Sequence, residues 1–163
     1  MLIDIFIWII FILLIAALWI VYTRAFGAEW VKTPRQVRKK MLRMLKLNKK
    51  DIFYDIGCGD GQLLIEAAPK VRQAIGIEID PLRFLIAKAR TSGYDNVKIV
   101  YGNLFRQNIN FATKIAVFLS PETNMRLGKI LHGKKLVVSY KWPVSGLKRI
   151  GYDARTRVYI QKL

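Results

Sequence analysis

The sequence has almost no cysteine or histidine. Its 163 residues include one cysteine, Cys58, and one histidine, His132. A single cysteine excludes an internal disulfide and fits a reducing compartment. We predict no metal site. We interpret Cys58 as a small side chain that fills space, and His132 as a cation at a helix end.

Acidic residues are also scarce. The chain has 11 Asp and Glu residues against 28 Lys and Arg residues, which gives a formal net charge of +17. A surface with this excess attracts anions. The basic residues are spread along the chain without a recognisable nucleic-acid-binding motif, so anionic lipid headgroups are favoured over nucleic acid as partners. A general bias of composition would also account for the charge.

Charge is missing altogether from the eighteen residues Ile5 to Tyr22. At about 1.5 Å per residue, a helix of this length nearly spans a bilayer. We therefore predict a transmembrane anchor over residues 1–24, with Trp19 and Tyr22 in an aromatic belt. A buried core helix and a cleaved signal peptide are the alternatives.

The distribution of charge beside this segment predicts its orientation. Residues 24–50 hold ten Lys or Arg residues and one acid, whereas Asp4 is the only ionic side chain before them. The positive-inside rule then places the rest of the chain in the cytoplasm, as a single-pass protein of the cell membrane. We interpret residues 25–50 as a basic amphipathic segment whose helix has Thr33 as N-cap and Pro34 in the first turn. Its basic residues, Arg35, Arg38, Lys39 and Arg43, are predicted on the outer face.

Residues 51–163 form the predicted ligand-binding domain, which begins with a glycine-rich turn. After the apolar strand Ile52–Tyr54 comes the run Asp55-Ile56-Gly57-Cys58-Gly59-Asp60-Gly61. Alternate glycines let the backbone pass close to a ligand. A dinucleotide fingerprint would need its third glycine at Gln62, and a phosphate loop would not present two carboxylates to an anion. The turn suits a cationic ligand without phosphate, S-adenosylmethionine, although a turn that binds nothing is the alternative.

The order of elements after the turn supports this ligand. A helix starts at Gln62 and a second strand, Gln73–Ile79, completes a βαβ unit. An acid at the end of that strand can accept hydrogen bonds from both ribose hydroxyls, and Glu78 is the candidate, with Asp80 in reserve.

The third predicted strand, Val97–Tyr101, leads to a turn in which adenine is expected. Asn103 offers a donor and an acceptor to the adenine edge, while Leu104 and Phe105 can cover its face. A plain turn is the alternative interpretation.

The remaining segments complete an α/β sheet. Predicted strands are 114–119 and 136–140, a helix covers 122–131, and 147–152 with 157–161 form an antiparallel hairpin. Ligands of such sheets bind at the carboxyl ends of the strands, so the methyl acceptor is expected near Phe118 to Glu122.

These motifs resemble a known family. The order Asp55-x-Gly57-x-Gly59-x-Gly61, Glu78, Gly102-Asn103, Phe118-Leu119 is similar to class I S-adenosylmethionine-dependent methyltransferases. The segments 30–34, 118–121 and 137–139 resemble the small protein lysine methyltransferases, which include membrane-anchored enzymes acting on the ATP synthase c subunit and the adenine nucleotide translocase. The resemblance covers residues 29–163 and extends to the apolar leader. Lys32 stands where that family usually has proline, and Asn103 replaces the acid of many relatives.

The resemblance implies a Rossmann-like class I methyltransferase sheet, mostly parallel with an antiparallel C-terminal hairpin, and helices on both faces. It implies N-methylation of a lysine on a membrane or membrane-proximal protein, with S-adenosylhomocysteine as the cofactor product. Two other functions stay open: methylation of a membrane small molecule such as a quinone or lipid, and a non-catalytic cofactor-binding interaction module. The sequence does not indicate the oligomeric state.

The candidate site residues fall into three groups. Those expected to bind the cofactor are Asp55, Gly57, Cys58, Gly59, Asp60, Gly61, Glu78, Ile79, Asn103, Leu104 and Phe118. Those expected to line the substrate channel are Trp30, Thr33, Pro121 and Trp142. Because an apolar channel lowers the pKa of a lysine, methyl transfer needs few catalytic groups. Ser120 and Glu122 are the candidates that could orient the amine.

Overall fold

The computed structural model describes residues 2–26 and 31–163. It divides into two compact units, Met1–Val31 and Lys32–Leu163. Trp30, predicted in the substrate channel, lies outside the described residues.

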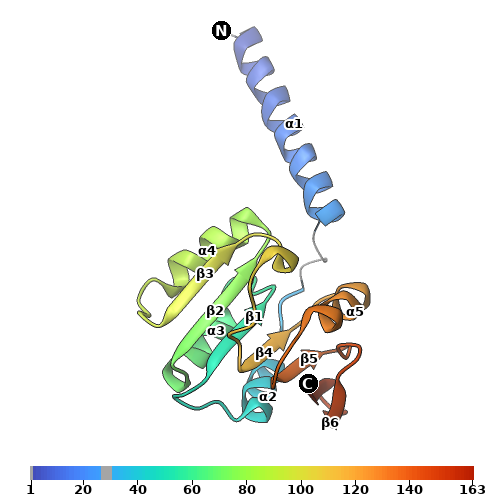
Figure 1. Ribbon diagram of the computed structural model, residues 1–163. Coiled ribbons are helices and arrows are strands. Elements are labelled where there is room, and N and C mark those ends of the chain that lie inside the picture. Colours follow the sequence, from blue (N-terminus) through green and yellow to red (C-terminus); the bar gives the residue numbers. More distant parts are fainter. Residues whose placement is uncertain (1, 27–30) are drawn as a thin grey trace. The chain divides into compact units, whose positions relative to one another are not determined.

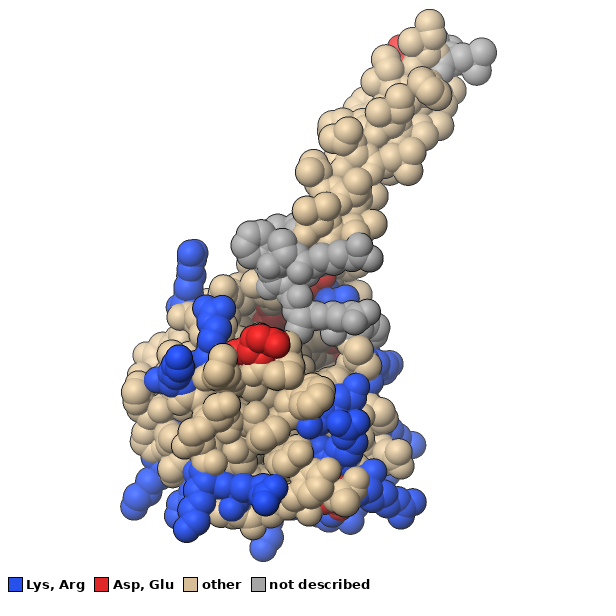
Figure 2. Space-filling model, turned by 90° about the vertical axis from the view of Figure 1, so that its right-hand side faces the viewer, with Lys and Arg blue, Asp and Glu red and all other residues tan. Residues whose placement is uncertain are grey.

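The first unit is one helix, α1 (Leu2–Phe26). Its segment Ile3–Val21 is long and apolar enough to cross a membrane, and its side chains are exposed. On the face drawn in Figure 2, the described surface of this helix is mostly tan, with acidic red near its amino-terminal end. A signal sequence near the amino terminus passes the same test of length and apolar composition.

The second unit contains a seven-stranded sheet in the order β3-β2-β1-β4-β5-β7-β6 (Figure 1). The strands are β1 Ile52–Ile56, β2 Gln73–Glu78, β3 Val97–Tyr101, β4 Lys114–Val117, β5 Leu136–Tyr140, β6 Lys148–Asp153 and β7 Val158–Lys162. The first five are parallel, while β7 is antiparallel to both β5 and β6. The predicted sheet, with its antiparallel C-terminal hairpin, is confirmed.

Helices cover both faces of this sheet. They are α2 Arg35–Leu45, α3 Gln62–Ala67, α4 Pro81–Thr91 and α5 Pro121–Ile130, with short 3₁₀ turns η1 Ala68–Lys70 and η2 Leu104–Arg106. One core cluster joins α2, α3 and α4 to Phe53, and the other joins α5 to Tyr54 and Ile56. Alternate residues of β1 therefore enter opposite cores, as the period of a strand requires.

The start of α2 differs from the prediction. The helix begins at Arg35, Pro34 stands at the N-cap with φ −58° and ψ 146°, and no side chain caps it. Because Pro34 itself is extended and its carbonyl accepts the first helical hydrogen bonds, from the N–H groups of Val37 and Arg38, the predicted N-cap, Thr33, is wrong. The carbonyl oxygen of Thr33 instead accepts a hydrogen bond of 2.6 Å from Nη1 of Arg38.

Arg38 also departs from the predicted outer face of α2. Its side chain is buried, and Nη2 lies 2.8 Å from Oε1 of Glu66 on α3. This ion pair ties α2 to α3, and α2 packs on β5 and β7. From Lys32 onward, the predicted basic segment thus belongs to the same compact unit as the sheet.

Candidate active site

The glycine-rich turn closes the carboxyl end of β1. Gly57, Gly59 and Gly61 have φ angles of 76°, 56° and 75°. The N–H groups of Gly57 and Cys58 both donate to the carbonyl of Ile77, at 2.9 and 3.1 Å, so the turn is fastened to β2. A Cβ at Gly57 would lie 2.8 Å from Cδ2 of Leu119. Glycine is therefore required here by both conformation and space.

Glu78 joins this turn to the end of β2. Its buried carboxylate accepts from Gly59 N–H at 2.8 Å through Oε2, and from the N–H groups of Ile79 and Asp80, at 3.0 and 2.9 Å, through Oε1. These three bonds hold the carboxylate at the sheet edge where a ribose is predicted. The ribose contact itself stays a prediction.

Asp55 is buried within β1, which continues past Tyr54, the last residue of the predicted strand, to Ile56. Burial raises the pKa of its carboxyl to about 8, and the like charges of Glu78 and Asp60 contribute to this rise. A cluster of acids at a turn with open glycine backbone suits a positively charged ligand and opposes an anionic one. The residues therefore fit S-adenosylmethionine, which carries a sulfonium and an amino group.

Asp60 has partners of its own in the protein. Its Oδ2 lies 2.5 Å from Nη1 of Arg90 on α4 and 3.7 Å from Nζ of Lys32. Asp80, the reserve candidate for the ribose, caps α4 by accepting from Arg83 N–H at 2.9 Å. Asp60 and Asp80 thus have partners within the protein, and a cofactor contact from either stays a prediction.

Cys58 packs beneath the turn. Its side chain is buried, and a Cβ at Gly76 on β2 would lie 2.7 Å from its sulfur. Burial, and then the charges of Asp55 and Glu78, raise the pKa of the thiol. A neutral, enclosed thiol fits the interpretation that Cys58 fills space, so a cofactor contact would come from its backbone.

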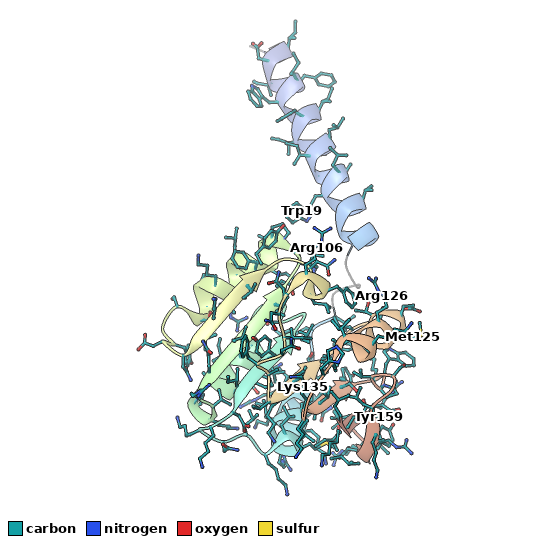
Figure 3. The ribbon with its side chains drawn as sticks, in the orientation of Figure 1. Trp19, Arg106, Met125, Arg126, Lys135 and Tyr159 are labelled. Carbon is teal, nitrogen blue, oxygen red and sulfur yellow. The ribbon has the colours of Figure 1, made fainter. Side chains whose placement is uncertain are left out.

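The turn predicted for adenine follows β3. The N–H of Gly102 donates to the carbonyl of Glu78 at 2.8 Å, and Oδ1 of Asn103 accepts from Phe105 N–H at 2.9 Å. An adenine contact from Asn103 would therefore use its amide nitrogen. The Phe105 ring is covered by the guanidinium of Arg126, whose Cζ is 4.1 Å from the ring centroid. Figure 3 labels Arg126 on α5. The sequence analysis did not identify Arg126, which comes from α5.

An aromatic pair stands at the carboxyl ends of β4 and β5. The ring centroids of Phe118 and Tyr140 are 4.6 Å apart, with an interplanar angle of 55°. Nζ of Lys141 lies 5.2 Å from the Phe118 centroid and 5.6 Å from that of Tyr140. This surface thus holds an alkylammonium group by cation–π interaction. Tyr140 and Lys141 were missed, although the carboxyl-end rule applied to β5 would have found them.

Trp142, predicted in the channel, follows this pair. Its side chain is exposed, and the guanidinium of Arg157 lies 5.9 Å from its ring centroid. Its carbonyl accepts from Nδ2 of Asn124 at 2.9 Å. The structure therefore ties the Trp142 backbone to α5 and to Tyr140, and its place in a substrate channel stays a prediction.

Ser120 and Glu122 begin α5. Ser120 is its N-cap, with Oγ 3.2 Å from Thr123 N and 3.0 Å from Thr123 Oγ1, and Pro121 is the first helical residue. Hydrogen bonds from its own N–H and from Ser120 lower the pKa of the exposed Glu122 carboxyl. These contacts show that both residues stabilise the start of α5. Their role toward an amine stays a prediction.

Two buried polar atoms near the same strand ends lack a hydrogen-bond partner among the described residues. They are Oδ1 of Asn124 on α5 and Oγ of Ser139 on β5. Both side chains are fully enclosed. An unsatisfied buried group of this kind costs about 1–3 kcal/mol. Neither residue was a sequence candidate, because burial without a partner has no signature in the sequence.

Comparison with known proteins gives two kinds of match. A family model described as the ANTKMT methyltransferase domain matches residues 55–150. A protein-lysine N-methyltransferase of Saccharolobus islandicus is 36% identical over 126 residues, which cover 72% of this chain and 78% of that protein.

Solved structures agree with the fold. An RNA methyltransferase from Salinibacter ruber, in complex with S-adenosyl-L-homocysteine, superposes with a TM-score of 0.72 at 28% identity, over 81% of this chain and 92% of that chain. The N-methyltransferase NodS from Bradyrhizobium japonicum has a TM-score of 0.59 at 18% identity, over 78% and 93% of the two chains, and shows the fold alone.

Proposed function

The chain belongs to the family described as the ANTKMT methyltransferase domain and is an S-adenosylmethionine-dependent methyltransferase, and on this premise we propose that its methyl acceptor is a protein lysine. The 36% identical relative, a protein-lysine N-methyltransferase, supports this acceptor over the RNA named for the 28% identical structure.

The observation that carries the proposal is the lysine ammonium already held by the aromatic pair. Phe118 and Tyr140 stand where strands β4 and β5 end, the sheet edge at which α/β enzymes bind ligands. Lys141 shows that their faces accept an alkylammonium group. A lysine from another protein would use the same faces.

We assign the cofactor residues as follows. Asp55 receives the amino group, Glu78 the ribose and the Asn103 amide the adenine edge, while the backbone at Gly57 and Gly59 lies against the ligand. S-adenosylmethionine supplies a methyl group on a sulfonium. Cys58, Asp60, Gly61, Ile79, Leu104 and Phe118 complete the proposed cofactor set.

The chain's own residues prepare the acceptor amine. A lysine must lose its proton before it can accept a methyl group, and desolvation against Phe118 and Tyr140 lowers its pKa. The same aromatic faces tolerate the positive charge that develops on nitrogen. Ser120 and Glu122 then orient the amine, with Thr33, Pro121 and Trp142 around the channel.

We propose in addition that α1 anchors the enzyme in the cell membrane as a single span, with the domain in the cytoplasm. The apolar segment Ile3–Val21 and the ten basic residues of 24–50 support this orientation. A chain of net charge +17 repels basic partners, so the target lysine belongs on a membrane or membrane-proximal protein or in an acidic patch. Anionic lipid headgroups are the proposed contacts of the basic segment.

Mass spectrometry of lysine methylation tests the acceptor. Membrane fractions are compared from cells with the native gene, without it, with Asp55→Ala, and with the exposed control Asp95→Ala. At least one methylated lysine peptide is expected to disappear in the deletion and in Asp55→Ala, and to persist in the control. Radiolabelled methyl that enters only lipid extract or RNA would refute a lysine acceptor, and cofactor binding without transfer to any fraction would refute catalysis.

A further inference from the structure

A basic groove runs between α2 and α3. It has a volume of about 700 Å³, and its charged lining residues are Arg35, Arg38, Lys39, Arg43, Glu66 and Lys70. A hollow of this size is large enough for a small-molecule group rather than a single ion.

The charge of the groove is not balanced within it. Glu66 is its one acidic lining residue. Its Oε1 already pairs with Arg38, 2.9 Å from Nε and 2.8 Å from Nη2. The other four cations of the groove are exposed, and no ion pair of theirs occurs among the described residues. The groove therefore offers four positive groups to an external anion.

The local geometry makes this charge unfavourable without a ligand. Arg35, Lys39 and Arg43 are spaced four residues apart, which places them on one line of α2, where like charges repel. Arg35 is also the first residue of the helix, whose first turn holds no acid and no side-chain cap. The positive end of the helix dipole and its N–H groups thus face further positive charge. An anionic group would relieve both repulsions.

The position of α2 in the chain points to one source of anions. The nine residue steps from Phe26 to Arg35 can reach at most about 30 Å. If α1 spans a bilayer, the groove is therefore tethered near a leaflet surface, where each basic side chain near anionic lipid gains about 1 kcal/mol. We infer that the groove binds the phosphate headgroup of an anionic phospholipid. This inference rests on the membrane anchoring proposed above.

Lysine footprinting of the full chain tests the groove. The protein is placed in nanodiscs of phosphatidylcholine alone or with phosphatidylglycerol, acetylated briefly, and analysed peptide by peptide. Acetylation of Lys39 and Lys70 is expected to slow about threefold or more in anionic discs. The exposed Lys98 and Lys148 serve as controls in the same molecule and are expected to change little.

Paired variants separate the groove from the general field of the protein. Arg35→Gln with Arg43→Gln should abolish the protection of Lys39 and Lys70, while the charge-matched pair Arg149→Gln with Arg155→Gln should retain it. Equal protection of all four lysines, or protection that survives loss of the two groove arginines, would overturn the inference.

Two soluble competitors identify the ligand class. Glycerol phosphate that protects Lys39 and Lys70 equally in neutral discs would indicate a free-phosphate site, and protection by polyglutamate alone would indicate an acidic polypeptide. Either result overturns the assignment to lipid. A chain that does not co-elute with neutral discs refutes the anchor, and the groove is then tested by sedimentation with phosphatidylglycerol vesicles, where the same variants must lose binding.

Discussion

Nζ of Lys141 lies 5.2 Å from the centroid of the Phe118 ring, so the chain's own lysine occupies a face proposed for the acceptor. An incoming lysine must displace it. Because an exposed cation–π contact contributes about 0.5–1 kcal/mol, Lys141→Met should lower the KM for acceptor about two- to fivefold with little change in kcat. Methyl incorporation at limiting acceptor measures this.

The controls for Lys141 are an exposed lysine and a conservative change. Lys134→Met should leave the KM for acceptor unaltered. Lys141→Arg should have a KM close to that of the native enzyme, because a guanidinium also lies on aromatic faces. A rise in KM for Lys141→Met would mean that the lysine helps to bind the acceptor rather than competing with it.

The second face of the aromatic pair belongs to Tyr140. Tyr140→Leu keeps an apolar wall but removes the ring that faces the acceptor ammonium. We expect kcat/KM for the acceptor to fall about tenfold while the Kd for S-adenosylmethionine, measured by calorimetry, stays within about twofold. Equal losses in both quantities would place Tyr140 in the cofactor site instead.

The raised pKa of Asp55 predicts how the free energy of unfolding and the cofactor affinity change with pH. The usual value is 3.8, and in the folded chain it is about 8. Between these values the folded chain holds a proton that the unfolded chain has lost, so the free energy of unfolding of the cofactor-free protein falls as pH rises through this window. A cationic ligand prefers the carboxylate, so the affinity for S-adenosylmethionine should rise as pH approaches about 8.

Asp55→Asn should remove both pH dependences. The variant cannot ionise, so its thermal unfolding midpoint without cofactor should exceed that of the native chain at pH 7.5, with a gap that narrows toward pH 5. Its cofactor affinity should be low and nearly independent of pH. Asp95→Asn, at an exposed turn, is the matched control. A native chain whose cofactor affinity is flat between pH 6 and 8.5 would contradict the role given to Asp55.

Much of the sheet could be predicted because its buried strands are short apolar runs bounded by glycine or charge. The predictions for 97–101 and 136–140 match β3 and β5 fully, and the other strands differ by one or two residues at one or both ends. The glycine-rich turn was equally visible, since alternate glycines directly after a strand are typical of a backbone that passes close to a ligand. Helix α4 (Pro81–Thr91) was not assigned, although Asp80 and Pro81 form a typical helix start.

Pairings between distant residues could not be predicted. Asp60 was expected to face the ligand, but its partner Arg90 lies thirty positions along the chain, on the helix that was not assigned. Arg38 was expected in solvent, and its burial depends on Glu66 of another helix. Periodicity describes one element at a time, so it cannot report which charge on a neighbouring element will meet a side chain.

Gly57 allows strain and collision to be measured separately. Gly57→Ala should destabilise the fold by about 1–2 kcal/mol, because it combines φ of 76° with a Cβ 2.8 Å from Cδ2 of Leu119. Gly133→Ala, at φ of 74° with open space around it, should show the conformational part alone. A double-mutant cycle with Leu119→Ala, measured by urea unfolding, separates the two parts. In the Leu119→Ala background, Gly57→Ala should lower the free energy of unfolding by a smaller amount, but the cost should not vanish. If the two substitutions show no coupling energy, the Leu119 side chain moves away from the new Cβ without cost.

Substitution of Ser139 tests whether its unsatisfied hydroxyl has a structural or a functional role. Its Oγ is buried without a hydrogen-bond partner among the described residues, directly before Tyr140 in β5. Removing an unsatisfied hydroxyl relieves its desolvation cost, so Ser139→Ala should keep or raise the thermal unfolding midpoint. If the hydroxyl meets the acceptor amine, kcat/KM should nevertheless fall about tenfold with an unchanged Kd for the cofactor. Ser92→Ala, at the exposed end of α4, is the control for loss of a hydroxyl. A Ser139→Ala enzyme that is more stable and fully active would show that the hydroxyl has no part in binding the acceptor.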